Sequence, residues 1–456
     1  MSAGDATNES FTLNKYWAAS MPADHKACAL LVASGLFLPL LYAMSLSILH
    51  QIHYWCTARL PSLTYHESSK LVDRILQSCP LLVQPYHPTW FLFNGHLQSA
   101  RVLAEDEDIH PQVQYKRELL DLSDGGVVSL DWATFASAED QINQPTVLMF
   151  HGLAGNSKAK YARVQADKLL DAGFRVVVMN ARGCGKTPVR TPKLFCAAYT
   201  EDAREAVIHI RQRIGVTVPL IGLGFSLGAN ILLKYLGEEG SGAQLTAAVS
   251  ICNPYCFTAT YQLLTYSWFH RVVYNSTLGK CLVRFFFEHS NAPETHEDHP
   301  DIDLKALRNA KYISDYDDLY TRRIYGYDTV AELYRDASCT PYIKKIAVPT
   351  LCISAKDDPV CAAVAIPYLD CKVNPNVLLA VTHGGGHIGL FTGQWKPKMW
   401  WSDVALQYCK AIVEMTQEGL VSTNLRAVQE NGALSPETTV PATSNLRHRG
   451  ATVASL

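Results

Sequence analysis

The 456-residue sequence lacks a basic surplus, since its formal net charge at pH 7 is −2. Domains that bind nucleic acid usually carry a strong excess of Lys and Arg, so this composition argues against a nucleic-acid partner. The sequence also lacks C-x-x-C pairs, although it contains 13 cysteines. Scattered cysteines in an odd number indicate reduced, buried thiols. We therefore expect no zinc site, no disulfide scaffold, and no other metal or cofactor.

Aromatic residues and cysteines are absent from residues 417–456, in which Ser, Thr, Pro and Asn are frequent. A segment of this composition has too little apolar surface to offset the entropy lost on folding. We therefore predict a disordered tail over residues 417–456. Residues 1–26 are polar and mixed, and we predict a polar N-terminal tail there.

Charged residues are absent from residues 27–49, a run of 23 mostly apolar residues. At about 1.5 Å per residue, a helix of this length crosses a hydrocarbon core about 30 Å thick. We predict an uncleaved transmembrane signal anchor at residues 27–49. A cleaved signal peptide is the alternative, but its apolar core would be shorter and nearer to Met1.

The orientation of this anchor does not follow from charge, because lysines and arginines lie on both sides of it. Two N-x-S/T sequons offer a test, one at Asn8 and one at Asn275. A glycan at Asn275 would place the catalytic domain in the lumen or outside the cell. A glycan at Asn8 would indicate the opposite orientation.

After a connecting region at residues 50–111, short apolar runs alternate with helical segments from residue 112 to residue 416. This alternation is typical of an α/β domain with a mostly parallel sheet and helices on both faces. The aromatic cluster at residues 86–93 is interpreted as packing. The predicted strands are residues 146–150, 175–179, 219–223, 246–252, 349–354 and 377–382. The predicted helices are residues 159–171, 200–214, 329–336 and 403–415.

The alternation is interrupted over residues 253–327, where aromatic residues are frequent. We predict a helical cap insertion at this point. Its aromatic residues form the core of a subdomain in one interpretation and line an apolar substrate pocket in the other, and the two are compatible.

The motif Gly224-Phe225-Ser226-Leu227-Gly228 joins a predicted strand to a helical segment. A G-x-S-x-G motif in this position fits a nucleophile elbow, a tight turn that presents the serine Oγ above the sheet. A serine hydroxyl is a poor nucleophile near neutral pH, so it needs a base within hydrogen-bond reach and a third group that orients this base.

An acid and a histidine follow Ser226 in the chain order of an α/β-hydrolase triad, each just after a predicted strand. We predict Asp358 as the acid and His387 as the base, because the ends of parallel strands meet at one edge of a sheet. Asp358 is followed directly by Pro359-Val360 and best fits an acid on a strand-end turn, and Asp357 remains the alternative. His383 remains an alternative to His387, which is flanked by glycines.

A tetrahedral intermediate of acyl transfer needs backbone N–H donors. In the elbow geometry one donor comes from the residue after the nucleophile, and the other from a loop after an earlier strand. We predict the amides of Leu227 and Leu153 as these donors.

Two further motifs are set aside. Residues 183–187 end like a phosphate-binding loop, but Asn180 stands where that loop needs its first glycine. His296 and Asp301 match an H-x-x-x-x-D spacing seen in acyltransferases, yet their charged, proline-bounded surroundings predict an exposed loop.

From about residue 78 to residue 415 the chain resembles the membrane-anchored α/β-hydrolase-domain family, and especially its branch with a phospholipase selective for medium-chain and oxidised phosphatidylcholines. The resemblance implies an α/β-hydrolase fold, a Ser226, Asp358 and His387 triad, and a single-pass type II anchor. Ala229 departs from the pattern, because relatives often carry another glycine there. The stretches that carry the resemblance are residues 94–98, 125–132, 180–185, 224–228, 374–377 and 385–389.

The sequence therefore predicts a membrane-anchored serine hydrolase that cleaves acyl esters of phospholipids. A sister branch of the same family contains monoacylglycerol lipases and esterases, so an acylglycerol substrate is the alternative. Acyl transfer to a lipid alcohol and a non-catalytic binding protein are further alternatives. The sequence indicates no particular oligomeric state.

Overall fold

The computed structural model describes residues 42, 44–49, 51–103, 113–134, 144–288 and 290–423. The predicted tail at residues 1–26, most of the predicted anchor at residues 27–49, and residues 424–456 lie outside the described residues. Within the described ranges, no helix combines the length and the apolar composition that crossing a membrane requires.

A nine-stranded sheet forms the centre of the structure, in the strand order β1-β9-β8-β7-β6-β4-β5-β3-β2. The six strands from β9 to β5 run parallel to one another, whereas β1, β3 and β2 pair in antiparallel fashion at the two edges. The predicted mostly parallel sheet is therefore confirmed. The strands are β1 Ser62–Thr64, β2 Gln114–Asp121, β3 Val127–Thr134, β4 Thr146–Phe150, β5 Arg175–Asn180, β6 Leu220–Phe225, β7 Ala247–Ile251, β8 Thr350–Ala355 and β9 Val377–Thr382.

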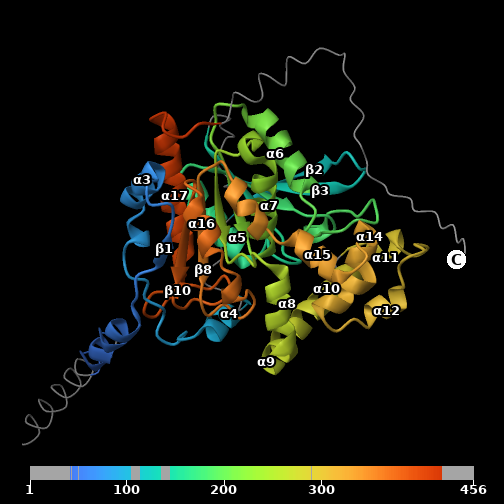
Figure 1. Ribbon diagram of the computed structural model, residues 1–456, viewed down its shortest axis with the longest axis horizontal. Coiled ribbons are helices and arrows are strands. Elements are labelled where there is room, and N and C mark those ends of the chain that lie inside the picture. The colour runs from blue at the N-terminus through green and yellow to red at the C-terminus, as the bar shows by residue number, and fades with distance from the viewer. Residues whose placement is uncertain are drawn as a thin grey trace, which may run out of the picture.

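Helices cover both faces of this sheet (Figure 1). Successive side chains of a strand point to opposite faces, which is why every residue of β4 to β9 is buried. One face packs against α3, α5 and α17, and the other against α6, α7 and α16. These helices are α3 Lys70–Ser78, α5 Lys160–Asp171, α6 Glu201–Ile214, α7 Leu227–Glu239, α16 Tyr368–Val373 and α17 Trp400–Gln417.

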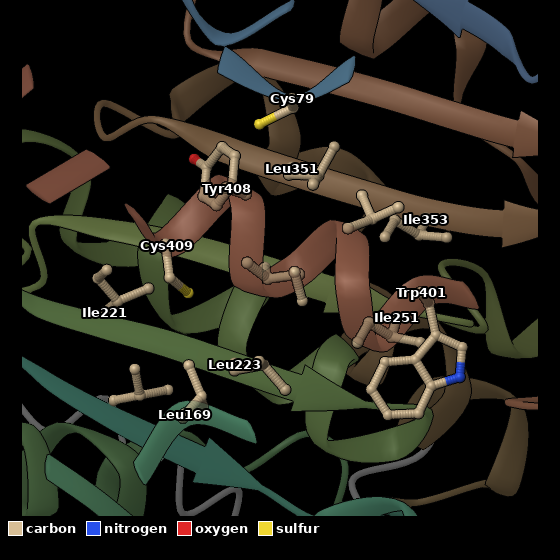
Figure 2. Close-up of a cluster of buried hydrophobic side chains, with 14 of the residues drawn as sticks. Cys79, Leu169, Ile221, Leu223, Ile251, Leu351, Ile353, Trp401, Tyr408 and Cys409 are labelled. Atoms are coloured by element: carbon tan, nitrogen blue, oxygen red, sulfur yellow. The ribbon is translucent and has the colours of Figure 1, made fainter. Parts of the chain in front are cut away.

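The long helix α17 closes the first of these faces. Figure 2 shows its side chains Trp401, Tyr408 and Cys409 lying over apolar side chains of the central strands, among them Ile251 and Ile353. The indole Nε1–H of Trp401 also donates to the Ile388 carbonyl at 2.8 Å. This helix therefore fastens the segment that follows His387 to the core.

The connecting region contributes to the domain more than its sequence indicated. Residues 62–64 form the edge strand β1 beside β9, and α3 packs against α17. A further helix, α4 Gly95–Leu103, lies beside the loop that carries His387. Its aromatic cluster packs only in part: Tyr86 is 3% exposed and donates its hydroxyl to the Phe391 carbonyl, whereas Trp90 and Phe93 are exposed.

The stretch at residues 253–327 is largely helical and projects from the sheet domain at the lower right of Figure 1. Part of it forms an apolar core with residues 181–194, which follow β5. Other side chains of the same stretch line the pocket described below. Its elements are α8 Phe257–Tyr266, α9 Trp268–His270, the π-helix η4 Arg271–Asn275, α10 Ser276–Glu288, α11 Ala292–Thr295, α12 Leu304–Arg308, α13 Ile313–Tyr316, the π-helix η5 Asp317–Thr321 and α14 Arg322–Tyr325.

Short elements complete the chain between these helices and strands. Helix α15 follows the insertion and packs against α8 and α7. The small strands β10 and β11 pair with each other beside the start of α17. These elements are α15 Val330–Ala337, β10 Phe391–Thr392, β11 Lys398–Met399 and the 3-10 turns Pro80–Leu82, Cys184–Lys186, Gly240–Gly242, Thr340–Lys345 and Ala363–Ala365.

Candidate active site

Ser226 sits on a sharp turn between β6 and α7. Its backbone angles are φ 50° and ψ −117°, a conformation that side chains larger than glycine rarely adopt. A Cβ added at Gly224 would lie 2.5 Å from the Ala229 Cα, and one added at Gly228 would lie 2.4 Å from the Phe150 carbonyl oxygen. Both glycines are therefore required by close packing, as an elbow geometry demands.

Ser226, His387 and Asp358 form a continuous chain of hydrogen-bond distances. The His387 Nε2 lies 2.8 Å from the Ser226 Oγ, and its Nδ1 lies 2.8 Å from the Asp358 Oδ2. The other carboxylate oxygen of Asp358 accepts from the amides of Val360 and Cys361, each at 2.8 Å. Asp358 is thus held in one orientation, and the imidazole is held between it and the serine.

The two alternative residues lie elsewhere. Asp357 accepts from the Gly386 amide at 2.8 Å, so it fixes the loop that precedes His387 and does not contact the imidazole. Burial raises the pKa of its carboxyl, the Gly386 hydrogen bond opposes this, and the neighbouring charge of Asp358 raises it further. His383 is exposed and does not line the pocket that contains Ser226. The geometry thus favours Asp358 and His387.

Helix α4 holds the loop that carries His387, and the sequence did not reveal this contact. The Ser99 hydroxyl accepts from the His387 amide at 2.8 Å and donates to the Gly95 carbonyl at 2.6 Å. Gly386 has a φ of +61°, and a Cβ there would lie 2.2 Å from the Gly95 carbonyl oxygen. The histidine loop is therefore packed against a helix almost three hundred residues earlier, and no spacing or periodicity in the sequence signals this contact.

Two residues that line the same pocket as Ser226 are the predicted oxyanion donors, Leu153 and Leu227. Leu227 begins α7, so its N–H has no intrahelical acceptor. Within the part of the chain that the structure describes, neither its amide nor that of Leu153 has a hydrogen-bond acceptor, and both residues line the pocket beside Ser226. The neighbouring Gly152 amide is occupied, since it donates to the Tyr161 hydroxyl at 2.9 Å.

The loop that carries Leu153 is positioned by buried polar groups. The Asp131 Oδ2 accepts from the Ser157 hydroxyl at 2.5 Å and from the Asn180 Nδ2 at 2.8 Å. The Asn180 Oδ1 accepts from the Ser157 amide at 2.7 Å, and Arg117 pairs with Asp131 at 2.7 Å. Burial raises the pKa of Asp131, but hydrogen bonds from Arg117, Ser157 and Asn180 bring it below its usual value.

His151, at the start of this loop, is a neutral structural residue. Burial lowers the pKa of its imidazole to about 4, although a hydrogen bond to the Gly152 carbonyl opposes this shift. Its Nε2 accepts from the Ala181 amide at 3.1 Å, so the Nδ1 carries the proton and donates to the Gly152 carbonyl at 2.7 Å.

A pocket of about 460 Å³ opens at Ser226 and His387. This volume lies in the range of small-molecule sites, and the walls are mostly apolar. The insertion supplies Leu264, Leu278 and Leu282 to these walls, and α4 supplies Val102. The aromatic insertion therefore serves both as a subdomain with its own core and as a wall of the pocket.

Two motifs of the insertion have structural roles. Asn275, in the second sequon, is 3% exposed, donates to the Leu264 carbonyl and accepts from the Ile313 amide. Because this side chain is enclosed, its amide has no room for a glycan, so a glycan at Asn275 is incompatible with the folded domain. His296 is buried rather than exposed, with its ring nitrogens 2.6 Å and 2.8 Å from the carbonyls of Ala292 and Pro192, and it does not line the pocket.

One group of metal-ligand atoms occurs among the described residues: Cys252, Asp358 and His387 place one atom each within 4.8 Å of one another. Burial and the nearby Asp358 raise the pKa of the Cys252 thiol well above its usual value, and this disfavours the thiolate that binds metals. The Cys252 Sγ also accepts from the Ile388 amide at 3.2 Å. Cys252 and Asp358 therefore lie near His387 because both contact the loop that carries it.

A comparison with known protein families agrees with this geometry. The sequence model of a family described as alpha/beta hydrolase fold matches residues 145–394, which is more than half of the chain and includes Ser226, Asp358 and His387. The chain belongs to the α/β hydrolase family.

Several named proteins are similar to this α/β hydrolase over most of its length. Human phospholipase ABHD3 is 32% identical over 407 residues, which cover 88% of this chain and 96% of the human protein. The embryogenesis-associated protein EMB8 of Picea glauca is 32% identical and covers 75% of each chain. A monoacylglycerol lipase of Saccharomyces cerevisiae is 29% identical over 72% of this chain and 81% of its own.

The two neighbouring aspartates of this α/β hydrolase are expected to differ in their effect on activity. Asp358→Asn replaces the acceptor beside the His387 Nδ1 with a group that favours the wrong imidazole tautomer, and kcat should fall by about 10³- to 10⁴-fold. Asp357→Asn retains an oxygen that accepts from the Gly386 amide, so kcat should fall by less than about tenfold. Steady-state hydrolysis of a p-nitrophenyl ester measures both, and equal losses would contradict the assignment.

Asp317 lines the pocket and accepts from the Tyr334 hydroxyl at 2.8 Å. Burial raises the pKa of its carboxyl to about 6, whereas hydrogen bonds from Thr321 and Tyr334 oppose the shift. The unfolded chain has a pKa of about 3.9, so the folded state binds the proton more tightly and the unfolding free energy should fall as pH rises from about 4 to about 6.

Asp317→Asn removes this titration. The variant should therefore melt at a higher temperature than the wild type at pH 7.5, and the difference should disappear near pH 4. Thermal unfolding followed by circular dichroism across this range measures the effect. A difference in Tm that does not change with pH would show that burial of the Asp317 carboxylate is not its cause.

Proposed function

We propose that this α/β hydrolase is a membrane-anchored serine hydrolase that cleaves acyl esters of phospholipids of the phosphatidylcholine type. The observation that carries the proposal is the chain of hydrogen-bond distances from the Ser226 Oγ through His387 to Asp358, in the wall of an apolar pocket. Family membership and relatives named as phospholipase and lipase support ester hydrolysis.

In the acylation step, the Ser226 Oγ attacks the carbonyl carbon of the ester while the His387 Nε2 takes the hydroxyl proton. Asp358 holds the Nδ1–H and stabilises the imidazolium that forms. The tetrahedral intermediate then collapses, the bond to the alcohol oxygen breaks, and His387 gives its proton to that oxygen. The acyl group is now an ester of Ser226, and the alcohol leaves.

In the deacylation step, water replaces the alcohol. His387 takes a proton from the water, whose oxygen attacks the acyl carbon, and the proton returns to the Ser226 Oγ as the carboxylic acid departs. The free amides of Leu153 and Leu227 would hold the oxyanion in both steps. Loss of one such donor typically costs about 3 kcal/mol of transition-state stabilisation.

The lipid character of the substrate is supported by the pocket and by the N-terminal sequence. Apolar side chains of the insertion and of α4 form walls that suit an acyl chain. The apolar run at residues 27–49 would place the enzyme at a bilayer as a single-pass, type II protein.

A monoacylglycerol lipase or acylglycerol esterase is the second candidate. The similarity to the yeast monoacylglycerol lipase favours it, because the same hydrogen-bonded residues would cleave either ester. A non-catalytic binding protein is less well supported, since a strained serine elbow with two free amides beside it has no evident use without acyl transfer.

The decisive comparison is between membranes exposed to wild-type protein and to Ser226→Ala. We expect the wild type to release fatty acid and lysophospholipid, and the variant to lose about 10⁴-fold or more of this activity. Release of glycerol and fatty acid from monoacylglycerol alone would favour the second candidate. Full activity of Ser226→Ala would refute a serine mechanism, and an acylated lipid alcohol in place of free acid would indicate acyl transfer.

A further inference from the structure

Two segments far apart in sequence meet at the mouth of the pocket. The Nδ1 of His96, in α4, lies 2.7 Å from the Tyr274 hydroxyl of η4, and the His96 ring is 5.1 Å from that of Phe269. Each segment also supplies pocket wall, with Leu103 from α4 and Val273 from η4. The surface around this contact is therefore continuous with the entrance to Ser226.

This surface carries large apolar side chains that no described residue covers. We define the mouth face as six large apolar residues whose exposed fractions show that they point to solvent. They are Phe93 (68%), Leu103 (81%), Tyr266 (80%), Trp268 (70%), Phe269 (43%) and Val272 (48%). Large contiguous apolar patches are rare on the surfaces of monomeric proteins and mark interaction sites.

The two parts of the chain that contain these segments carry basic residues but no acidic ones. Residues 74–104 and residues 240–287 contain no Asp or Glu, although the whole chain has 42 such residues against 40 Lys and Arg. Arg271 and Lys280 are exposed on the insertion beside the mouth face. Aromatic side chains with basic neighbours suit the boundary between acyl chains and phosphate groups of a bilayer. Two acidic residues, Asp315 and Asp318, belong to another part of the insertion and line a groove together with Tyr266.

An exposed helical segment that precedes the domain points the same way. Residues 51–57 are helical and carry exposed apolar side chains, with Trp55 79% exposed, and they follow the apolar run at residues 27–49. The Nδ1 of His53 in this helix lies 2.9 Å from the Nε2 of His87. His87 shortly precedes Phe93 of the mouth face in the sequence. In Figure 1 this helix projects from the same lower edge that α4 and α9 occupy.

We propose that the mouth face inserts into the interfacial layer of a phospholipid bilayer, so that substrate enters the pocket directly from the membrane. This inference rests on the proposed hydrolysis of lipid esters. Arg271 and Lys280 contact lipid phosphates, and the aromatic side chains occupy the level of the head groups. The mouth face is separate from the anchor, which holds the enzyme near the surface but does not orient the pocket.

The test compares two substrates in one preparation. Full-length protein is reconstituted into phosphatidylcholine vesicles with an anionic phospholipid, and hydrolysis of vesicle lipid and of soluble p-nitrophenyl butyrate is measured. Trp268→Ser with Phe269→Ser should lower vesicle hydrolysis by about tenfold or more while the soluble ester is cleaved within about twofold of the wild-type rate. The control Leu369→Ser, on α16 and 78% exposed, should change neither.

Unchanged vesicle hydrolysis in the double variant would overturn the proposal, and so would a parallel loss on both substrates, which indicates a disturbed pocket. A second measurement does not depend on activity. Brominated phosphatidylcholine should quench more fluorescence in the wild type than in Trp268→Phe, and equal fractional quenching would place Trp268 outside the bilayer. Quenching without hydrolysis of either ester would uphold the mouth face and refute the proposed enzyme.

Discussion

The backbone of Ser226 is the constraint on which the rest of the site depends. Its positive φ is strained, and a conformation of this kind typically costs about 1–3 kcal/mol. It persists because β6 and α7 are both buried and because Gly224 and Gly228 allow them to approach closely. The sheet and helix thus hold the hydroxyl above the strand ends, where His387 and the two free amides can reach it.

The imidazole is held by a second set of contacts, which come from distant parts of the chain. Asp358 fixes one ring nitrogen, Asp357 fixes the Gly386 amide, and Ser99 fixes the amide of His387 itself. Trp401 fastens the next turn to α17. A base that must lie 2.8 Å from the nucleophile therefore depends on three separate elements, the loop after β8, α4 and α17, and this positioning is what a triad needs for proton transfer.

The sequence was sufficient for the central strands, and the three site residues it predicted at strand ends are ones that the structure brings within hydrogen-bond distance. Buried parallel strands are continuous apolar runs, so the strands at residues 146–150 and 377–382 were predicted with their observed bounds. The edge strands were missed for a physical reason: β1 has only three residues, and β2 is mostly polar with no buried residue, so neither forms a continuous apolar run. The role of Ser99 depends entirely on a tertiary contact, so no local pattern announces it.

Within the insertion, sequence patterns did not predict which polar side chains are buried. The Asn275 sequon satisfies the acceptor pattern, yet its amide is enclosed and hydrogen-bonded. His296 stands in a charged, proline-bounded stretch but is fully buried against carbonyl oxygens. In both cases neighbouring helices bring apolar cover that composition alone does not reveal.

The most direct test of the account is to trap the acyl-enzyme. Wild-type protein mixed with a p-nitrophenyl ester, quenched in acid within the first turnover and digested for mass spectrometry should carry one acyl group on the peptide that contains Ser226, and Ser226→Ala should carry none. An acyl group on another residue, or release of p-nitrophenol with no adduct at Ser226, would contradict the central claim.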